Sequence, residues 1–191
     1  MKATFVFLLL ACVTAKGQVV KLESENNHST IEFFVPISDG ITKISGKFTD
    51  YHIDIQFIDS SLLKSKIEVR INPASIATGI AGRDEDLKTS DFFDVAKFQE
   101  ITFVSEVILK IGGQYVTKGK CTVHGVTREI EIPFIVTGVR KNYVIGFSGT
   151  FKLKRSDYAI GTSWKHTTDD KFIGDEIEIH VDFWTRKSKK M

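Results

Sequence analysis

The sequence predicts an all-β fold, a single antiparallel up-and-down β-barrel of about eight strands. Short stretches in which apolar and polar residues alternate recur along the chain, and turn-forming residues separate them. No long stretch has the periodicity of a helix. A meander of hairpins can protect its edge strands by closing into a barrel, which makes the barrel the expected arrangement.

The alternating stretches place apolar side chains on one face and polar ones on the other, which is typical of strands with one wet face. The expected strands are residues 31–35, 51–57, 67–71, 101–103, 115–123, 129–136, 145–153 and 177–183. Turn-type residues separate them at 38–40, 59–61, 112–113, 124–125 and 140–142. The pattern breaks around residues 79–95, where we expect short helical turns with Ser90 as an N-cap.

The N-terminus has the profile of a signal peptide. Lys2 precedes an apolar run at residues 4–13, and the small residues Ala15 and Gly17 follow it. The run is shorter than the roughly 20 apolar residues that a membrane-spanning helix needs. We therefore expect residues 1–17 to be removed and the mature protein to be exported to the periplasm.

Residues 9–12, Leu-Leu-Ala-Cys, favour an alternative export route. They resemble the lipobox at which a bacterial lipoprotein is cut and acylated, although Leu10 is unusual there. On that interpretation the protein is a lipoprotein anchored through Cys12. After cleavage at residue 17 the only cysteine left is Cys121, so no internal disulfide can form, and we expect Cys121 to be a small buried apolar residue.

The charge of the mature chain argues against nucleic acid as a partner. Cleavage removes two of the 26 basic residues and none of the 24 acidic ones, which leaves a net charge of zero. Four of the remaining basic residues lie in the C-terminal tail, residues 186–191, so the expected barrel domain, residues 18–185, is mildly acidic. Nucleic acid requires a basic face. The basic tail leaves a peripheral contact with a membrane open, but a frayed, solubilising terminus is the simpler interpretation. The sequence does not indicate an oligomeric state.

Several motifs are more specific than the alternation. Ala-Ser-Ile-Ala-Thr-Gly at residues 74–79 is followed by Arg-Asp at 83–84 and by Asp-Phe-Phe-Asp-Val at 91–95. Thr-Val-His-Gly-Val-Thr-Arg forms a hairpin-like segment at 122–128, and Phe-Lys-Leu-Lys-Arg-Ser-Asp-Tyr stands at 151–158.

In the order and spacing of these motifs, residues 27–184 resemble the YceI-like family. The members of this family are bacterial envelope proteins with a lipocalin-like barrel that binds polyisoprenoid lipids. The chain departs from the family pattern at three places, with Ile37 and Asp86 in place of histidines and Lys-Phe-Gln at 97–99 in place of Lys-Tyr-Pro. These departures leave the fold assignment intact and weaken any head-group contact that relatives make through those histidines.

The resemblance implies that the barrel holds an isoprenoid-type lipid, a polyprenyl phosphate or a quinone-like molecule, and that the protein uses no other cofactor. Of the 15 phenylalanines, 13 remain after the expected cleavage. An eight-stranded barrel has room for packed side chains or for one slender ligand, so composition alone leaves a filled core and a lined tunnel open. The resemblance favours the tunnel.

The expected tunnel lining consists of large apolar residues, most of them on the apolar faces of predicted strands. They are Phe33, Val35, Phe48, Phe92, Phe93, Phe103, Phe147, Phe151 and Phe183. Gly149 shares a face with Phe147 and Phe151, so we expect a phenylalanine at this position to fill the tunnel.

Polar residues within the recognisable motifs are candidates for contact with a lipid head group. We select Arg83, His124 and Arg155. The two arginines are the preferred donors to a pyrophosphate or quinone head group, because a guanidinium matches phosphate oxygens bidentately. A structural role remains the alternative for each. Arg83 and Arg155 could tie loops to the ends of the barrel, and His124 has the position of a hairpin tip.

The sequence does not predict an enzyme or a metal site. It has no Gly-x-Ser-x-Gly elbow, and its histidines are scattered singly rather than spaced as metal ligands. Two other functions stay open beside the lipid carrier: a ligand-free structural or stress-response barrel, and an enzyme that acts on a lipophilic substrate.

Overall fold

The computed structural model describes residues 18–169 and 171–189, and within them it contains eleven β-strands and one α-helix. The expected signal peptide and the lipobox at Cys12 lie outside the described residues. The strands are β1 (Val19–Ser24), β2 (Thr30–Ile37), β3 (Thr42–Phe48), β4 (Tyr51–Ile58), β5 (Ser61–Ile71), β6 (Ile76–Ala77), β7 (Ile101–Ile111), β8 (Gln114–Val123), β9 (Val126–Arg140), β10 (Val144–Lys154) and β11 (Glu176–Lys187). The helix is α1 (Ala81–Lys88), and short 3₁₀ turns are η1 (Asn26–His28), η2 (Pro73–Ser75) and η3 (Arg155–Tyr158).

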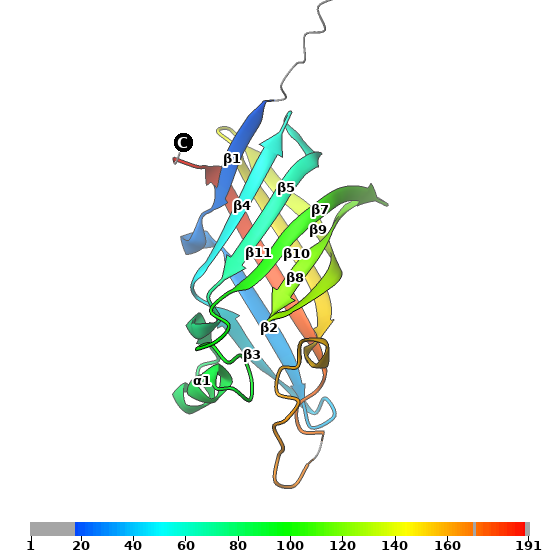
Figure 1. Cartoon of the computed structure of the whole chain (residues 1–191). Coiled ribbons are helices and arrows are strands. Elements are labelled where there is room, and N and C mark those ends of the chain that lie inside the picture. The colour runs from blue at the N-terminus through cyan, green and yellow to red at the C-terminus, as the bar shows by residue number, and fades with distance from the viewer. Residues whose placement is uncertain (1–17, 170, 190–191) are drawn as a thin grey trace, which may run out of the picture.

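The strands close into an antiparallel barrel, as the sequence predicts (Figure 1). They pair in the order β1-β4-β5-β7-β8-β9-β10-β11, and β11 returns to β1 through Ser24 and Thr185. Next to that contact β11 pairs with β2, so β1 and β2 lie end to end along β11. In the same way β4 pairs with β1 and β3 with β2. β6 likewise continues the line of β5, because β3 pairs with β6 where β4 pairs with β5. The eleven strands therefore fill eight positions in the barrel, and three of these positions hold two strands each.

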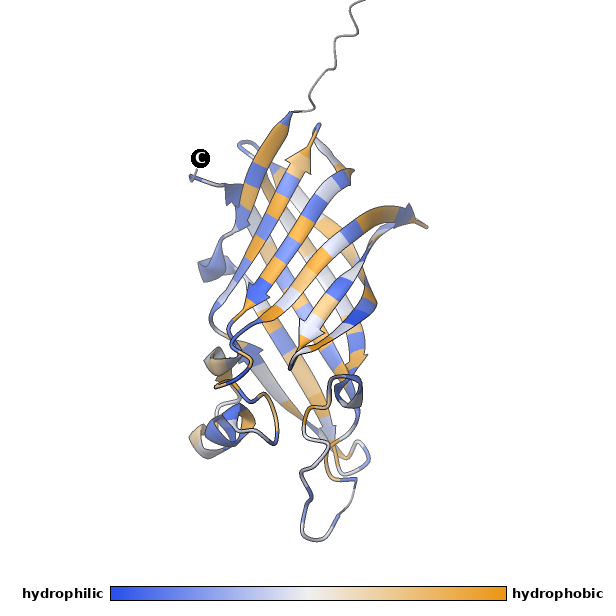
Figure 2. Ribbon diagram, in the orientation of Figure 1, coloured by the Kyte–Doolittle hydropathy of each residue, from blue (hydrophilic) through white to orange (hydrophobic). Residues whose placement is uncertain are grey.

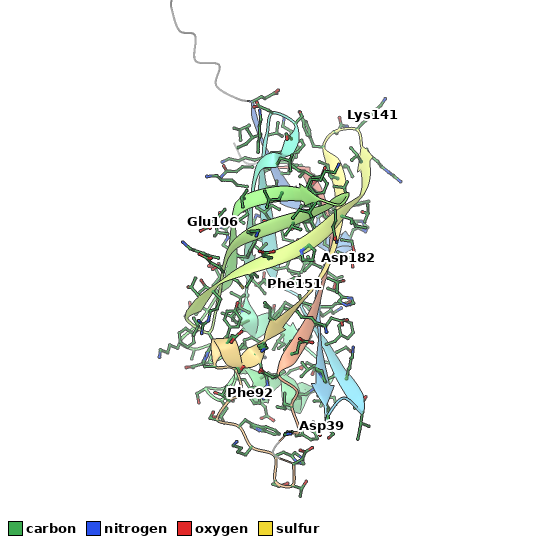
Figure 3. All side chains as sticks on the ribbon, turned by 90° about the vertical axis from the view of Figure 1, so that its right-hand side faces the viewer. Asp39, Phe92, Glu106, Lys141, Phe151 and Asp182 are labelled. Atoms are coloured by element: carbon green, nitrogen blue, oxygen red, sulfur yellow. The ribbon has the colours of Figure 1, made fainter. Side chains whose placement is uncertain are left out.

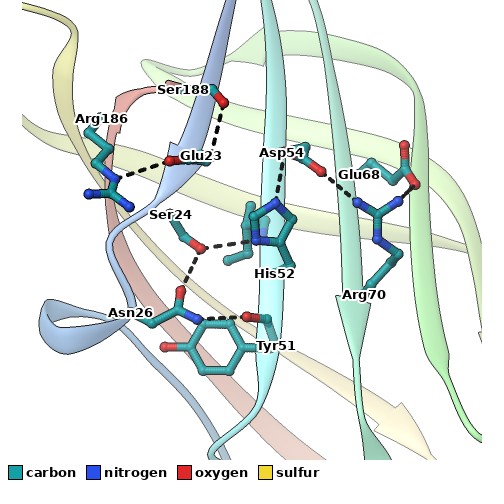
Figure 4. A network of polar contacts seen from close by, with 11 residues as sticks. Glu23, Ser24, Asn26, Tyr51, His52, Asp54, Glu68, Arg70, Arg186 and Ser188 are labelled. Atoms are coloured by element: carbon teal, nitrogen blue, oxygen red, sulfur yellow. Dashed lines mark hydrogen bonds and ion pairs between the residues drawn. The ribbon is translucent and has the colours of Figure 1, made fainter. Parts of the chain in front are cut away.

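Side chains bridge the break between β1 and β2 (Figure 4). Ser24 Oγ donates to Asn26 Oδ1 (2.7 Å) and accepts from the backbone N–H of Ile53 (3.3 Å). Asn26 Nδ2 donates to the carbonyl oxygen of Tyr51 (2.7 Å). Backbone groups at a break lose their ladder partners, and these side chains supply replacements. The wall stays closed where the strand is interrupted.

Hydrophobic and hydrophilic residues alternate along the strands (Figure 2), and apolar residues line the interior of the barrel. All eight predicted strands are present, whereas β1, β3 and β6 were not predicted. β3 lacks a clear apolar face because Gly46 stands where the ring of Phe33 crosses the strand, and a Cβ at this position would overlap that ring. At the other end of the chain, β11 continues to Lys187, into the range expected as a tail, and Arg186 pairs with Glu23 (3.2 Å).

The expected helical turns are present around α1, but Ser90 is not an N-cap. The helix begins after Ile80 and ends at Lys88, so Ser90 lies in the turns beyond it. The start of the helix is stabilised instead by Asp84, whose carboxylate accepts from the N–H and the hydroxyl of Thr78. No helix in the described part of the chain is long and apolar enough to cross a membrane.

The two ends of the barrel differ. At the end where β1 begins, which we call the closed end, the interior is packed with side chains at most 9% exposed: Val20, Leu22, Ile55, Phe57, Ile108 and Ile145. The opposite end, which we call the mouth, carries α1, the β2–β3 hairpin and the connection from β10 to β11 (Figure 1).

Candidate ligand-binding cavity

The mouth half of the barrel encloses a cavity of about 490 Å³. This volume lies within the range of about 300–1,000 Å³ that is usual for small-molecule sites. Its lining comes from α1 and from strands β2 to β11, because inward side chains from each of them reach the same space. Figure 3 shows Phe151 within the barrel and Phe92 at its mouth.

All nine apolar residues selected from the sequence line this cavity: Phe33, Val35, Phe48, Phe92, Phe93, Phe103, Phe147, Phe151 and Phe183. Phe103 and Phe147 are buried, whereas Phe33, Phe151 and Phe183 keep part of their surface exposed. A side chain that points inward in the middle of the barrel and is still partly exposed must lie beside open space. Their contact with a ligand remains a prediction.

Two kinds of lining residue were not predicted from the sequence. The first comprises aliphatic residues on the same apolar strand faces, such as Ile53, Val69 and Ile130, and their alternation was a signal that could have identified them. The second comprises Trp164 and Phe172 in the connection between β10 and β11. That connection has no periodic pattern of apolar residues, so the sequence does not indicate which of its side chains point into the cavity.

A row of four aromatic rings crosses strands β8 to β11, and we call it the aromatic row: Tyr115, Phe134, Phe147 and Phe183. Neighbouring ring centroids lie 5.4 Å, 6.0 Å and 4.9 Å apart along the row. Phe134, Phe147 and Phe183 line the cavity, and the packed interior of the closed end lies beyond them. The row therefore forms the inner limit of the cavity.

Arg83 lies at the mouth and lines the cavity together with Asp86. Its Nε donates to Thr78 Oγ1 (2.7 Å) and its Nη2 to the Thr78 carbonyl oxygen (2.9 Å). These bonds orient the guanidinium without neutralising it, because no carboxylate of the described residues forms an ion pair with Arg83. The geometry is suited to an anionic group at the mouth.

Arg155 also lines the cavity, but its guanidinium is occupied by backbone carbonyl oxygens. Nε donates to Gly174 (3.1 Å), Nη1 to Ile160 (2.9 Å) and Gly161 (3.0 Å), and Nη2 to Ile173 (3.1 Å). These bonds join the two ends of the connection that covers the mouth. They favour the structural alternative for Arg155.

His124 is not brought to the cavity. It lies in the turn between β8 and β9 with a φ of 50°, and its Nδ1 donates to the carbonyl oxygen of Tyr158 (3.1 Å). Its ring packs edge-on against Phe98, with centroids 4.6 Å apart. His124 therefore ties a hairpin to η3.

The buried polar residues of the wall are neutral at ordinary pH. Burial raises the pKa of the Cys121 thiol to about 11, and burial likewise raises the pKa of Tyr158. A protonated thiol is a weak nucleophile. Among the described residues no group of three or more His, Cys, Asp and Glu side chains could hold a metal ion.

Gly149 does not offer the space that the sequence analysis expected. A Cβ at this position would lie 2.9 Å from the carbonyl oxygen of Pro133, a backbone atom on β9. A phenylalanine there would strain the pairing of β9 with β10 before it filled the tunnel, so that expectation is wrong. Val69, a cavity-lining residue with exposed surface, is a better position for a bulky side chain.

Comparison with known structures supports the fold. A Campylobacter jejuni YCEI protein superposes with a TM-score of 0.68 at 31% identity, covering 78% of this chain and 88% of that one. Burkholderia cenocepacia BcnA gives 0.75 at 23% identity, covering 84% and 98%. A polyisoprenoid binding domain from Saccharophagus degradans gives 0.71 at 15% identity, covering 88% and 99%.

Sequence comparison identifies the family. A UPF0312 protein of Yersinia pestis (strain Pestoides F) is 31% identical over 176 residues, which is 90% of this chain and 88% of the relative. A UPF0312 protein of Shewanella sp. (strain ANA-3) is 31% identical over 157 residues, 80% and 82% of the two chains. The model of the YceI-like domain matches residues 22–184. The chain belongs to the YceI-like family.

Proposed function

We propose that this protein binds a long isoprenoid-type lipid, such as a polyprenyl phosphate or a prenyl quinone, in the barrel cavity and carries it unchanged. The observation that carries the proposal is a cavity of about 490 Å³ with apolar walls and a closed inner end. Each buried methylene contributes about 0.8 kcal/mol, so one isoprene unit contributes roughly 3–4 kcal/mol before ordering costs. A few buried units therefore give useful affinity.

The distribution of polar groups supports one orientation of the ligand. Arg83 and Asp86 lie at the mouth, whereas the inner limit is the aromatic row. The tail end enters first, so a chain short enough to be fully enclosed keeps its polar head group at the mouth beside Arg83. The polyisoprenoid binding domain of Saccharophagus degradans, which shares the fold, is consistent with a ligand of this class.

A carrier that alters no bonds needs no nucleophile or metal in its cavity. Cys121 and Tyr158 are held in their protonated forms by burial, and the remaining lining is almost entirely hydrocarbon. These features support binding rather than catalysis. An enzyme would convert the added lipid into a different compound, which chromatography would separate from it.

We further propose that the protein acts in the periplasm after removal of residues 1–17. A carrier that shields an apolar tail is useful in an aqueous compartment between membranes. The intact mass of the mature protein from its own host tests the proposal, with a chain that begins at Gln18 as the expected result. A chain that begins at an acylated Cys12 would support the anchored form, and one that retains Met1 would contradict both.

A variant that fills the cavity tests the proposed binding. Val69→Trp adds bulk inside the barrel, so it should abolish the rise in melting temperature that prenyl lipids give the wild type, while the protein stays folded. Val104→Trp is the matched control, because Val104 is 48% exposed on the outer face of the neighbouring strand β7. If neither variant changes the effect of the lipid, the lipid does not occupy the cavity.

A further inference from the structure

The inner limit of the cavity is a candidate for setting the length of the bound chain. We infer that Phe147 is a specificity-determining residue, which sets how many isoprene units the cavity accepts. The inference rests on the proposed function and deepens it, because it names the feature of the lipid that this site selects. It concerns the closed end of the cavity rather than the head group.

Phe147 occupies the centre of the aromatic row. It is 2% exposed, and its ring lies 6.0 Å from Phe134 and 4.9 Å from Phe183. Strand pairing fixes the contact with Phe183, because Phe147 and Phe183 are partners across β10 and β11, and it places Phe134 opposite Gly149, two residues along β10. A chain end that reaches this ring meets a continuous aromatic surface.

The side chains behind Phe147 leave it little room to move away. Leu22 and Ile55 are each 1% exposed, and Ile145 on the same strand is 6% exposed. Thr185 is fully buried, and its Oγ1 donates to the Tyr143 carbonyl oxygen (3.0 Å) while accepting from the N–H of Ile145 (3.3 Å). Because packed interiors are dense, displacement of Phe147 would create strain throughout this layer.

The depth of the cavity corresponds to a small number of isoprene units. From Phe147 to Leu153 the strand β10 rises through about six residues, or roughly 20 Å. A strand tilt of about 35–45° leaves roughly 15 Å along the barrel axis. An extended isoprene unit contributes four carbon–carbon bonds, about 5 Å. About three units therefore fit between the aromatic row and the mouth.

A series of prenyl monophosphates tests the inference by isothermal titration calorimetry. For the wild type we expect the Kd to fall about tenfold or more from geranyl to farnesyl, and by less than about threefold from farnesyl to geranylgeranyl. Phe147→Ala removes six ring carbons, slightly more than one isoprene unit. In this variant the tenfold fall should continue to geranylgeranyl phosphate.

Phe151→Ala is the matched control, because Phe151 lines the cavity from the same strand nearer the mouth. It should change the Kd of every prenyl monophosphate by a similar factor. The fall in Kd with chain length should still level off at farnesyl phosphate. If the alanine variant folds poorly, Phe147→Leu replaces it as a milder change. In this variant too the fall in Kd with chain length should extend beyond farnesyl phosphate. Circular dichroism checks the fold of each variant.

Two outcomes would overturn the inference and leave lipid binding intact. The first is a wild-type affinity that still rises tenfold from farnesyl to geranylgeranyl phosphate. The second is a Kd that still stops falling at farnesyl phosphate in both Phe147 variants. If no prenyl phosphate of any length binds the wild type, the proposed function itself fails, and the inference fails with it.

Discussion

Nη1 of Arg155 donates a hydrogen bond of 3.0 Å to the carbonyl oxygen of Gly161. The guanidinium makes three further hydrogen bonds to carbonyl oxygens and so holds together the backbone at the mouth. Gly161 has a φ of +61°, and a Cβ there would lie 2.8 Å from the ring of Phe92. The glycine lets the backbone turn close to both side chains. The connection between β10 and β11 is thereby fixed over the cavity.

Arg155→Met should therefore destabilise the protein. The substitution keeps the apolar stem and leaves four carbonyl oxygens without their donor, so we expect a loss of about 2–4 kcal/mol in urea unfolding. Arg128→Met is the control, because exposed Arg128 makes one bond of 3.3 Å to the carbonyl oxygen of Asp157, and it should cost less than about 1 kcal/mol. Unchanged stability with lost binding of prenyl phosphates would make Arg155 a head-group residue instead.

Arg83→Gln should weaken the binding of a prenyl phosphate more than that of the matching prenyl alcohol. A charge-assisted contact to phosphate is worth about 1.5–3 kcal/mol, so the expected ratio of the two losses is about 10- to 150-fold. Lys88→Gln on the same helix is the control and should leave the ratio near one, because Lys88 pairs with Glu85 (2.8 Å) outside the lining. Equal losses for phosphate and alcohol would contradict a head-group role for Arg83.

The protein should lose stability in alkaline solution because of Cys121. Burial raises the pKa of this thiol from 9.0 to about 11. Between these values the unfolded chain releases the proton while the folded chain keeps it, so the free energy of unfolding falls by about 1.4 kcal/mol per pH unit. Below pH 9 both states keep the proton, and this dependence is absent.

Urea unfolding of Cys121→Ala checks this prediction. Its stability should fall less steeply from pH 9 to 11 than that of the wild type. Val123→Ala, a change at a buried residue without a proton to release, should keep the steep dependence. If all three proteins show the same slope, other groups account for the alkaline sensitivity. At neutral pH a reductant should leave the melting temperature unchanged, since Cys121 is free and is the only cysteine among the described residues.

The barrel could be predicted because most strands bury one face and expose the other. In β4 the residues Tyr51, Ile53, Ile55 and Phe57 are buried and alternate with more exposed ones, so the period of two is readable from the sequence. β3 could not be found in this way. Its lysines and serine outnumber its apolar residues, and Gly46 is explained only by the ring of Phe33, which arrives from another strand.

The lining of the cavity could be predicted for the same reason, whereas its limits could not. Phe147 and Phe183 meet through the register of β10 and β11, and the long irregular connection between these strands leaves that register unspecified in the sequence. Arg155 was an attractive phosphate ligand by residue type alone. Its four carbonyl partners lie in an irregular connection, whose path depends on tertiary structure.

Native mass spectrometry of the protein purified from its own host tests directly whether the cavity holds a lipid. We expect a non-covalent adduct that organic extraction recovers as an intact prenyl lipid, and Val69→Trp purified in the same way should lack it. A wild-type protein that carries no extractable lipid, and whose melting temperature stays unchanged when prenyl lipids are added, would rule out the proposed lipid binding and leave a ligand-free barrel.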